Sequence, residues 1–205
     1  MVARDDGYIA IYDTLLEEVE MIAAHDNMVS SLALDSLGAD PQFMCSCGWD
    51  EAVVLWDLHM LDQPLAVIES AHRGPVMDVI FTPKDPHTFA SIGHDGFIRS
   101  WDSRCGDDAV VILNCGQRGS SLAFIDEVTM MAGLVDGRMR CFDARKCNWQ
   151  LAEVDLEEPI RRVKRLGPAS DLMGVATNRG FAVVTFKSGE IEVRGRCGGS
   201  LTALI

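Results

Sequence analysis

Serine, histidine and aspartate occur together twice in this chain of 205 residues, and these three side chains are the components of a hydrolytic triad. Each set is followed by a tryptophan. The members are His25, Ser46, Asp50 and Trp56 in the first set and His72, Ser91, Asp95 and Trp101 in the second. Equivalent members lie 45 to 47 residues apart. A catalytic triad needs one cleft with one oxyanion site, so the duplication favours a structural role. We therefore expect no catalytic residues, and an enzyme that uses one of the Ser–His pairs is the alternative.

Cysteines and basic clusters are the other candidates for chemistry. Cys45 and Cys47 are two residues apart, but zinc is usually held by ligand pairs at turn spacing with a second pair nearby. Cys141 and Cys147 do not supply that second pair. We expect buried, reduced thiols and no metal. The basic run at 161–165 alternates between the faces of a strand, and the chain has no glycine-rich phosphate loop, so we expect no cofactor.

Internal repeats explain the duplication. Nine-residue segments begin with a turn signal such as Asp-Gly and continue as an extended apolar run. They are DDGYIAIYD at 5–13, WDEAVVLWD at 49–57, HDGFIRSWD at 94–102, VDGRMRCFD at 135–143 and, weakly, KSGEIEVRG at 187–195. Their starts are 44, 45, 41 and 52 residues apart. A repeat of this length indicates an array of similar units.

Each repeat holds about four short strands. Further β-rich runs precede the nonamers, at 27–34, 74–81, 118–125 and 158–166. Several strands, such as AVVLW, are apolar on both faces, which suits a sheet packed between two neighbours. The pattern predicts an all-β propeller of about four to five blades.

The residues that carry chemistry now fit a known pattern. Ala24-His25 with Trp56-Asp57, and Ala71-His72 with Trp101-Asp102, resemble the Gly-His…Trp-Asp signature of WD40 repeats, with alanine in place of glycine. The resemblance implies that tryptophan, serine, histidine and aspartate form a structural tetrad in each of these two repeats. The fourth repeat has Ala132, Asp136 and Phe142 at the equivalent positions and no matching histidine, so we expect it to lack a tetrad.

We expect residues 1–205 to form one partial propeller, with repeats near 1–13, 25–57, 72–102 and 115–143 and a degenerate one at 158–195. The mean period is 45.5 residues, so seven blades would need more than 300. The chain also begins inside a repeat. These features predict an incomplete propeller, such as a fragment or a shortened isoform.

Charge is distributed unevenly along the chain. The formal net charge is −13, and residues 1–62 carry −12 of it, from 13 acidic residues and one basic residue. Overall acidity argues against direct nucleic-acid binding. The chain has no apolar run long enough to span a membrane and no signal sequence at its start, so we expect it in the cytoplasm or the nucleus. Glu17, Glu18 and Glu20 are candidate contacts for a basic partner.

Two resemblances within the WD40 family suggest particular roles. FASIGHDGFIRSWDSR, at 89–104, resembles the box by which some WD40 proteins bind the adaptor of cullin–RING ubiquitin ligases. Asp95, Trp101, Asp102 and Arg104 fit that box, and Arg104 would be the exposed contact. WDSRC, SSLAF and VDGRMRCFDARK, between 101 and 146, resemble the non-catalytic WD40 subunits of arginine methylosomes.

The methylosome resemblance implies an interaction scaffold. Such a subunit binds a protein arginine methyltransferase and presents basic substrates such as histone and Sm tails. The acidic segment suits this role, so it is the function that we favour. A substrate receptor of a cullin–RING ligase, a peroxisomal targeting-signal receptor and a nuclear-pore propeller are the alternatives.

Overall fold

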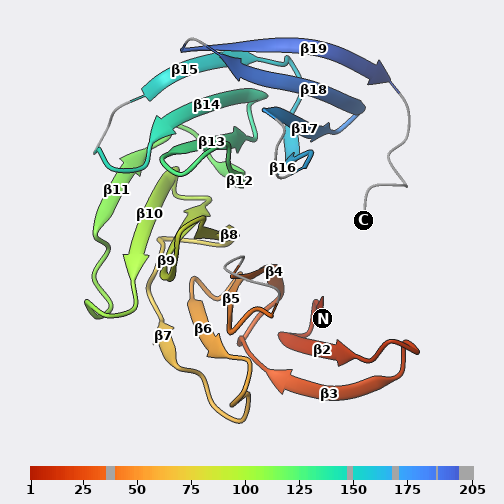
Figure 1. Ribbon diagram of the computed structural model, residues 1–205, viewed down its shortest axis with the longest axis vertical. Coiled ribbons are helices and arrows are strands. Elements are labelled where there is room, and N and C mark those ends of the chain that lie inside the picture. The colour runs from red at the N-terminus through yellow and green to blue at the C-terminus, as the bar shows by residue number, and fades with distance from the viewer. Residues whose placement is uncertain (36–39, 147–149, 168–170, 188, 199–205) are drawn as a thin grey trace.

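The computed structural model describes residues 1–35, 40–146, 150–167, 171–187 and 189–198. They form five antiparallel sheets that follow one another around a central axis as an arc (Figure 1). In each sheet, strands that are consecutive in the chain pair with each other. We number the sheets as blades 1 to 5. The expected all-β propeller is confirmed, and the described residues contain no helix.

Blade 1 has three strands and the other blades have four. Blade 1 comprises β1 (Val2–Ala3), β2 (Tyr8–Tyr12) and β3 (Glu18–Ala23). Blade 2 comprises β4 (Val29–Leu34), β5 (Phe43–Gly48), β6 (Val53–Asp57) and β7 (Ala66–Ile68). Blade 3 comprises β8 (Val76–Thr82), β9 (Asp85–Gly93), β10 (Phe97–Asp102) and β11 (Val111–Asn114). Blade 4 comprises β12 (Gly119–Phe124), β13 (Thr129–Leu134), β14 (Arg138–Asp143) and β15 (Gln150–Asp155). Blade 5 comprises β16 (Ile160–Arg165), β17 (Leu172–Thr177), β18 (Gly180–Lys187) and β19 (Glu190–Gly198).

The core lies between the blades rather than inside one of them. Four apolar clusters fill the four spaces between successive sheets. Between blades 1 and 2, for example, Ile9 and Ile22 pack against Trp56. Strands in the middle of a blade are buried on both faces, so β6 has four buried residues in succession instead of an alternating pattern. This burial explains why strands such as β6 are apolar at successive positions in the sequence.

Left-handed turns join equivalent strands in several blades: β1 to β2, β9 to β10 and β13 to β14. Gly7, Gly96 and Gly137 have φ angles of 88°, 80° and 95° in these turns, which glycine adopts at little cost. A Cβ atom on Gly7 would lie 2.2 Å from the carbonyl oxygen of His25, so the loop that carries this histidine also requires glycine here. Glu51 occupies the corresponding turn of blade 2 with a φ of 72°. The Asp-Gly signal of the repeats therefore marks one hairpin.

Blade 5 corrects one alignment made from the sequence. The segment 187–195 was matched to the nonamers, but it contains the turn between β18 and β19, one hairpin later than in the other blades. The equivalent hairpin joins β17 to β18, next to Gly180. Gly189, at a φ of 86°, produces a similar turn signal and explains the shift. The blade itself is a regular four-stranded sheet.

The arc is open between its first and last blades (Figure 1). Each of the four apolar clusters joins two successive blades, and among the described residues none of them joins blade 5 to blade 1. The predicted incomplete propeller is confirmed. Val2 and Met21 lie on the face of blade 1 that points away from blade 2, and they are 49% and 48% exposed. This face is apolar and borders the opening.

Candidate functional site

The second set of polar residues forms a chain of hydrogen bonds in blade 3. Trp101 Nε1 donates to Ser91 Oγ at 2.9 Å, and Ser91 Oγ lies 2.7 Å from His72 Nε2. His72 Nδ1 lies 2.9 Å from Asp95 Oδ1. One assignment of protons satisfies the links from tryptophan to aspartate: Ser91 donates to Nε2 of a neutral His72, and Nδ1–H donates to the carboxylate. In this assignment Arg99 Nη1, which also lies 2.6 Å from His72 Nδ1, donates to Asp95 rather than to the ring. These hydrogen bonds connect the loop that precedes blade 3 to the two middle strands of that blade.

The first set repeats this arrangement in blade 2. The indole of Trp56 donates to Ser46 Oγ at 3.0 Å, and that oxygen lies 2.8 Å from His25 Nε2. Nδ1 of His25 lies 2.9 Å from Asp50 Oδ2. All eight candidates from the sequence are thus brought together as two separate chains of four. Their contribution to stability stays a prediction.

Both histidines are held in the neutral form. Burial lowers the pKa of His72 and of His25 below the ordinary value of 6.5, and the neighbouring carboxylates oppose this effect only in part. Burial alone would raise the pKa of Asp95, but the hydrogen bonds from His72, from the Arg73 amide and from Arg99 lower it overall. Arg99 Nη1 donates to Asp95 Oδ2 at 2.7 Å and supplies the compensating positive charge.

The buried serines cannot act as nucleophiles. Ser46 and Ser91 are 0% exposed, and each Oγ already accepts an indole N–H. A substrate carbonyl would have to displace that tryptophan from the core to reach either oxygen. The geometry therefore disfavours the alternative of an enzyme built on one Ser–His pair.

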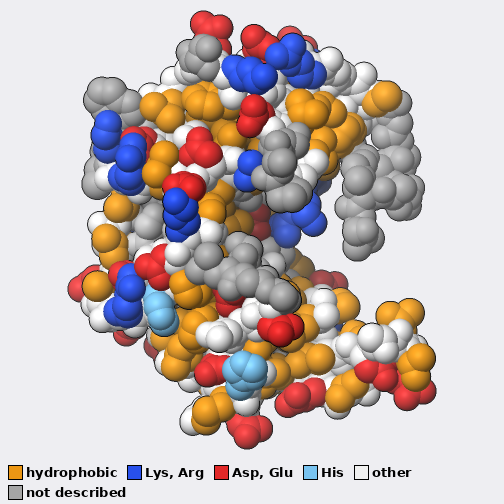
Figure 2. Space-filling view, viewed as in Figure 1, with side chains coloured by type: hydrophobic (Ala, Val, Ile, Leu, Met, Phe, Trp, Pro, Cys, Tyr) orange, Lys and Arg blue, Asp and Glu red, His pale blue; other side chains and the backbone are white. Residues whose placement is uncertain are grey.

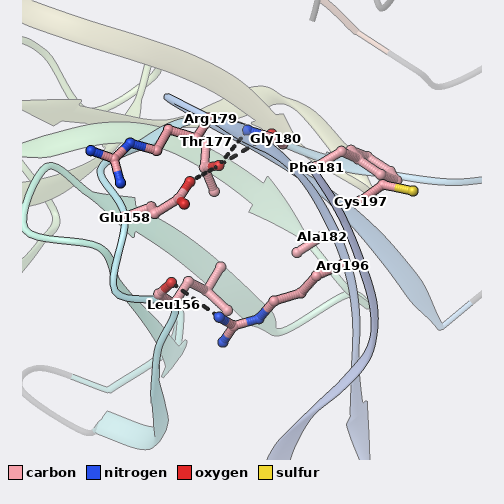
Figure 3. Close-up of a pocket in the computed structure, with 9 residues that line it drawn as sticks. All are labelled: Leu156, Glu158, Thr177, Arg179, Gly180, Phe181, Ala182, Arg196 and Cys197. Atoms are coloured by element: carbon pink, nitrogen blue, oxygen red, sulfur yellow. Dashed lines mark hydrogen bonds between the residues drawn. The ribbon is translucent and has the colours of Figure 1, made fainter. Parts of the chain in front are cut away.

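The described residues of blades 4 and 5 form no such chain of hydrogen bonds. Ala132 and Phe142 occupy the positions of the serine and the tryptophan in blade 4, by the register of β13 with β14. In blade 5 the loop is linked differently: Thr177 Oγ1 donates to Glu158 at 2.7 Å and lies beside Gly180 (Figure 3). Figure 3 also shows Arg196 reaching the carbonyl of Leu156 across the same small pocket. The sequence analysis missed this link.

Arg104 lies at the end of β10 and is 53% exposed. Its Nε bonds Asp102 Oδ1 at 2.8 Å and its Nη2 bonds Asp85 at 2.7 Å. The bond from Arg104 lowers the pKa of Asp102 to about 2. Arg145 makes the same arrangement with Asp143 at the end of β14, with Nε 2.9 Å from Oδ1. The two corners are therefore structural equivalents on adjacent blades, and the sequence analysis identified only the first of them.

Three acidic residues of the first segment lie at the start of the outer strand of blade 1. Glu17 precedes β3 and Glu18 and Glu20 lie on it, and all three are exposed. At the other end of β3, a cleft between blades 1 and 2 is lined by Asp26, Asp50 and Glu69 and by apolar residues that include Val54 and Val67. In Figure 2, Lys and Arg side chains gather over blades 4 and 5 at the top, whereas Asp and Glu side chains are prominent over blades 1 and 2 below. The arc therefore has an acidic end.

The described residues contain no group of three or more side chains placed to hold a metal ion. They also include no helix long and apolar enough to cross a bilayer. Cys45, Cys47, Cys115 and Cys141 are buried free thiols, and burial raises the pKa of Cys141 to about 12. What the described surface offers is charged and apolar contact area.

An arc of four-stranded antiparallel sheets, packed face to face around an axis, defines a β-propeller. The sequence family model described as "WD domain, G-beta repeat" matches residues 16–57 and 62–102. The chain therefore carries WD40 repeats, and the two matched segments contain both tryptophan-to-aspartate chains.

Relatives share parts of the chain. The Methylosome protein WDR77 of Xenopus laevis is 32% identical over 122 residues, which cover 56% of this chain and 34% of that protein. The DDB1- and CUL4-associated factor 6 of Mus musculus is 31% identical over 87 residues, or 37% of this chain and 10% of that one. A Denticleless protein homolog of Xenopus tropicalis is 26% identical over 106 residues and 15% of its length. The matched segments thus span between a tenth and about a third of these relatives.

Solved structures agree on the fold. A chain in the crystal structure of the Mitotic Checkpoint Complex superposes with a TM-score of 0.81 at 15% identity, over 97% of this chain and 60% of that one. The β-propeller domain of Myceliophteria_thermophila Cps50 (Swd1) gives 0.79 at 17% identity, over 98% and 69%. At these identities the likeness concerns the fold alone. Propellers of the WD40 family are generally non-catalytic scaffolds for protein–protein interactions, and the chain carries repeats of that kind.

Proposed function

We propose that this chain is a methylosome-type scaffold, which binds a protein arginine methyltransferase and presents basic substrate segments to it. The observation that carries the proposal is the acidic end of the arc. Residues 1–62 have a formal charge of −12, and their exposed glutamates at the start of β3 lie on the blade that forms one wall of the cleft between blades 1 and 2. The relative named as a methylosome protein supports the same role.

The cleft suits an arginine side chain. Asp26 and Asp50 carry the charge that a guanidinium requires, and Val54 and Val67 offer apolar surface to its methylene groups. Exposed carboxylates on β3 would steer the rest of a basic tail by long-range attraction, which salt screens over about 8 Å at physiological ionic strength. The free thiols suit the cytoplasm or the nucleus, where we place the protein.

The test is binding of an arginine-rich tail peptide. The variant Glu17→Gln/Glu18→Gln/Glu20→Gln should bind more weakly and associate more slowly, and the difference should shrink as salt rises. A matched control, Asp107→Asn/Asp108→Asn/Glu190→Gln, removes three exposed charges from blades 3 and 5 and should bind like the parent. Equal losses in both variants, or an association rate independent of salt, would leave the acidic end without a role in recognition.

A second function is supported by the twin arginine corners. We propose, as the alternative, a substrate receptor that presents Arg104 and Arg145 to the adaptor of a cullin–RING ligase. Both guanidiniums are exposed and are held in the same orientation by Asp102 and Asp143. The relative named as a DDB1- and CUL4-associated factor supports it. Arg104→Ala should abolish capture of the adaptor in a pull-down, and unchanged capture would eliminate this function.

A further inference from the structure

Four residues occupy one register position on the innermost strands of successive blades. The position follows a one-residue bulge in each strand, and its pairing partners on the next strand are Cys47, Ile92, Gly133 and Ala176. Its occupants are Ser31 on β4, Asp78 on β8, Ser121 on β12 and Arg162 on β16. These strands line the centre of the arc (Figure 1).

In blades 2 to 4 this position bonds to the next blade. Ser31 Oγ donates to Asp78 Oδ1 at 2.6 Å. Asp78 Oδ2 accepts the Leu122 amide at 2.9 Å and the Ser121 hydroxyl at 2.7 Å. Ser121 Oγ in turn accepts the Val163 amide at 3.1 Å. The position therefore fastens each blade to the one that follows it.

Arg162 departs from this pattern. Its guanidinium crosses the centre of the arc, where Nη1 lies 3.1 Å from Asp78 Oδ1 and Nη2 lies 3.2 Å from Ser31 Oγ. It thereby joins blade 5 to blades 3 and 2 and passes over blade 4. The Asp78 side chain is only 4% exposed, whereas that of Arg162 is 50% exposed. A carboxylate buried to this degree requires a cation or several donors, and Asp78 has both.

We propose that Asp78 and Arg162 form a clasp across the central channel that fixes the position of blade 5 relative to blades 2 and 3. Contacts between neighbouring blades alone would let small rotations accumulate along the arc, because each blade touches only the next. A direct bond between blades that are not neighbours removes that freedom. Asp78 is the hub, since it receives donors from blades 2, 4 and 5.

The chain offers a probe for this geometry. Cys105 in blade 3 and Cys197 in blade 5 are exposed, whereas the other described cysteines are buried. Spin labels on these two thiols, in a parent protein with Cys147→Ser, report the spacing of the two blades by double electron–electron resonance. Arg162→Met keeps most of the side-chain stem and removes the charge and both donors. Lys164→Met is the matched control. Lys164 is exposed two residues further along β16, and its replacement removes the same single positive charge.

We expect Arg162→Met to broaden the distribution of distances and to lower the urea midpoint, with its β-sheet circular dichroism retained. Lys164→Met should leave the distribution and the midpoint as in the parent. A distribution as narrow in Arg162→Met as in the parent would overturn the clasp. So would equal broadening in both variants, which would make it a general effect of charge. Loss of all β structure in Arg162→Met would also overturn it, because the residue would then hold the whole fold rather than position one blade.

Discussion

Replacing Trp101 by phenylalanine tests whether the buried hydrogen-bond chains stabilise the blades. The substitution keeps an aromatic ring in the core between blades 2 and 3 but removes the indole N–H that donates to Ser91 Oγ at 2.9 Å. Ser91 still donates to His72, so one acceptor site of its hydroxyl loses its partner at a position with 0% exposure. No water replaces the lost donor unless the core opens.

The expected cost follows from that burial. A buried acceptor left without its donor costs about 1–3 kcal/mol, and the smaller ring adds a cavity term of the same sign. For a chain of this size, 1 kcal/mol lowers the melting temperature by about 2–4 °C, so the lost hydrogen bond lowers it by about 2–12 °C. Trp56→Phe should give a similar loss, because Ser46 is equally buried.

A double-mutant cycle separates the hydrogen bond from the packing. Ser91→Ala alone should destabilise the protein, because the Trp101 donor and the His72 acceptor both lose their partner. The double variant Trp101→Phe/Ser91→Ala should lose less than the sum of the single losses, by about 0.5–3 kcal/mol. Phe142→Trp in blade 4 should give no matching gain, because Ala132 has no hydroxyl to accept the bond. Unchanged melting temperatures, or strictly additive losses, would refute the stabilising role.

Three further outcomes are expected. Burial holds the pKa of His72 below 6.5 in the folded protein. Its contribution to the free energy of unfolding is therefore complete above about pH 6.5 and falls below that pH, because the unfolded chain takes up a proton there. The contribution of Asp95, whose pKa in the folded protein lies below 3.8, is lost only under more acidic conditions. Urea midpoints between pH 8 and 4 should therefore fall on acidification, and a rise would contradict this sign. Glu51→Gly relieves a left-handed φ of 72° and should raise the free energy of unfolding in urea by up to about 1 kcal/mol, and a lower value would contradict the strain. Maleimide should label Cys105 in the native protein and spare Cys47, whose pKa burial raises to about 12.

Much of this geometry is readable from the sequence because a meander repeats its spacing. The connection between the first two strands is much longer in blade 2 than in blade 3. From the serine onward the spacing is identical, because Asp50 and Asp95 follow their serines by four residues and Trp56 and Trp101 by ten. The last hairpin was misplaced because Gly189 and Gly180 both follow strands and both suit a turn. The local sequence alone does not show which of these two glycines begins the third strand of blade 5, because that depends on which strands pair.

The clasp shows a different limit. Aligning the innermost strands places Ser31, Asp78, Ser121 and Arg162 in one column, so their equivalence could have been found. The sequence cannot show that Arg162 passes over blade 4, because that contact depends on how strongly the arc curves. Its bonding partners are 84 and 131 residues away in the chain. Curvature is a property of all the blade interfaces together rather than of any one segment.

The cleft and the arginine corner lie on opposite rims of the arc, and this separates their tests. In blade 3, β10 runs from Phe97, next to Asp95 at the tetrad rim, to Asp102 at the arginine corner. Six residues of strand span about 17 Å, so an arginine held in the cleft on the tetrad side and an adaptor on the Arg104 side would not compete for surface. The glutamates of β3 lie on the Arg104 rim, but in blade 1 rather than in blade 3. Arg104→Ala should therefore leave binding of the tail peptide unchanged, and neutralising the glutamates of β3 should leave adaptor capture unchanged. If Arg104→Ala weakened peptide binding, the recognition surface would have to extend around the rim, and the acidic end alone could not account for it.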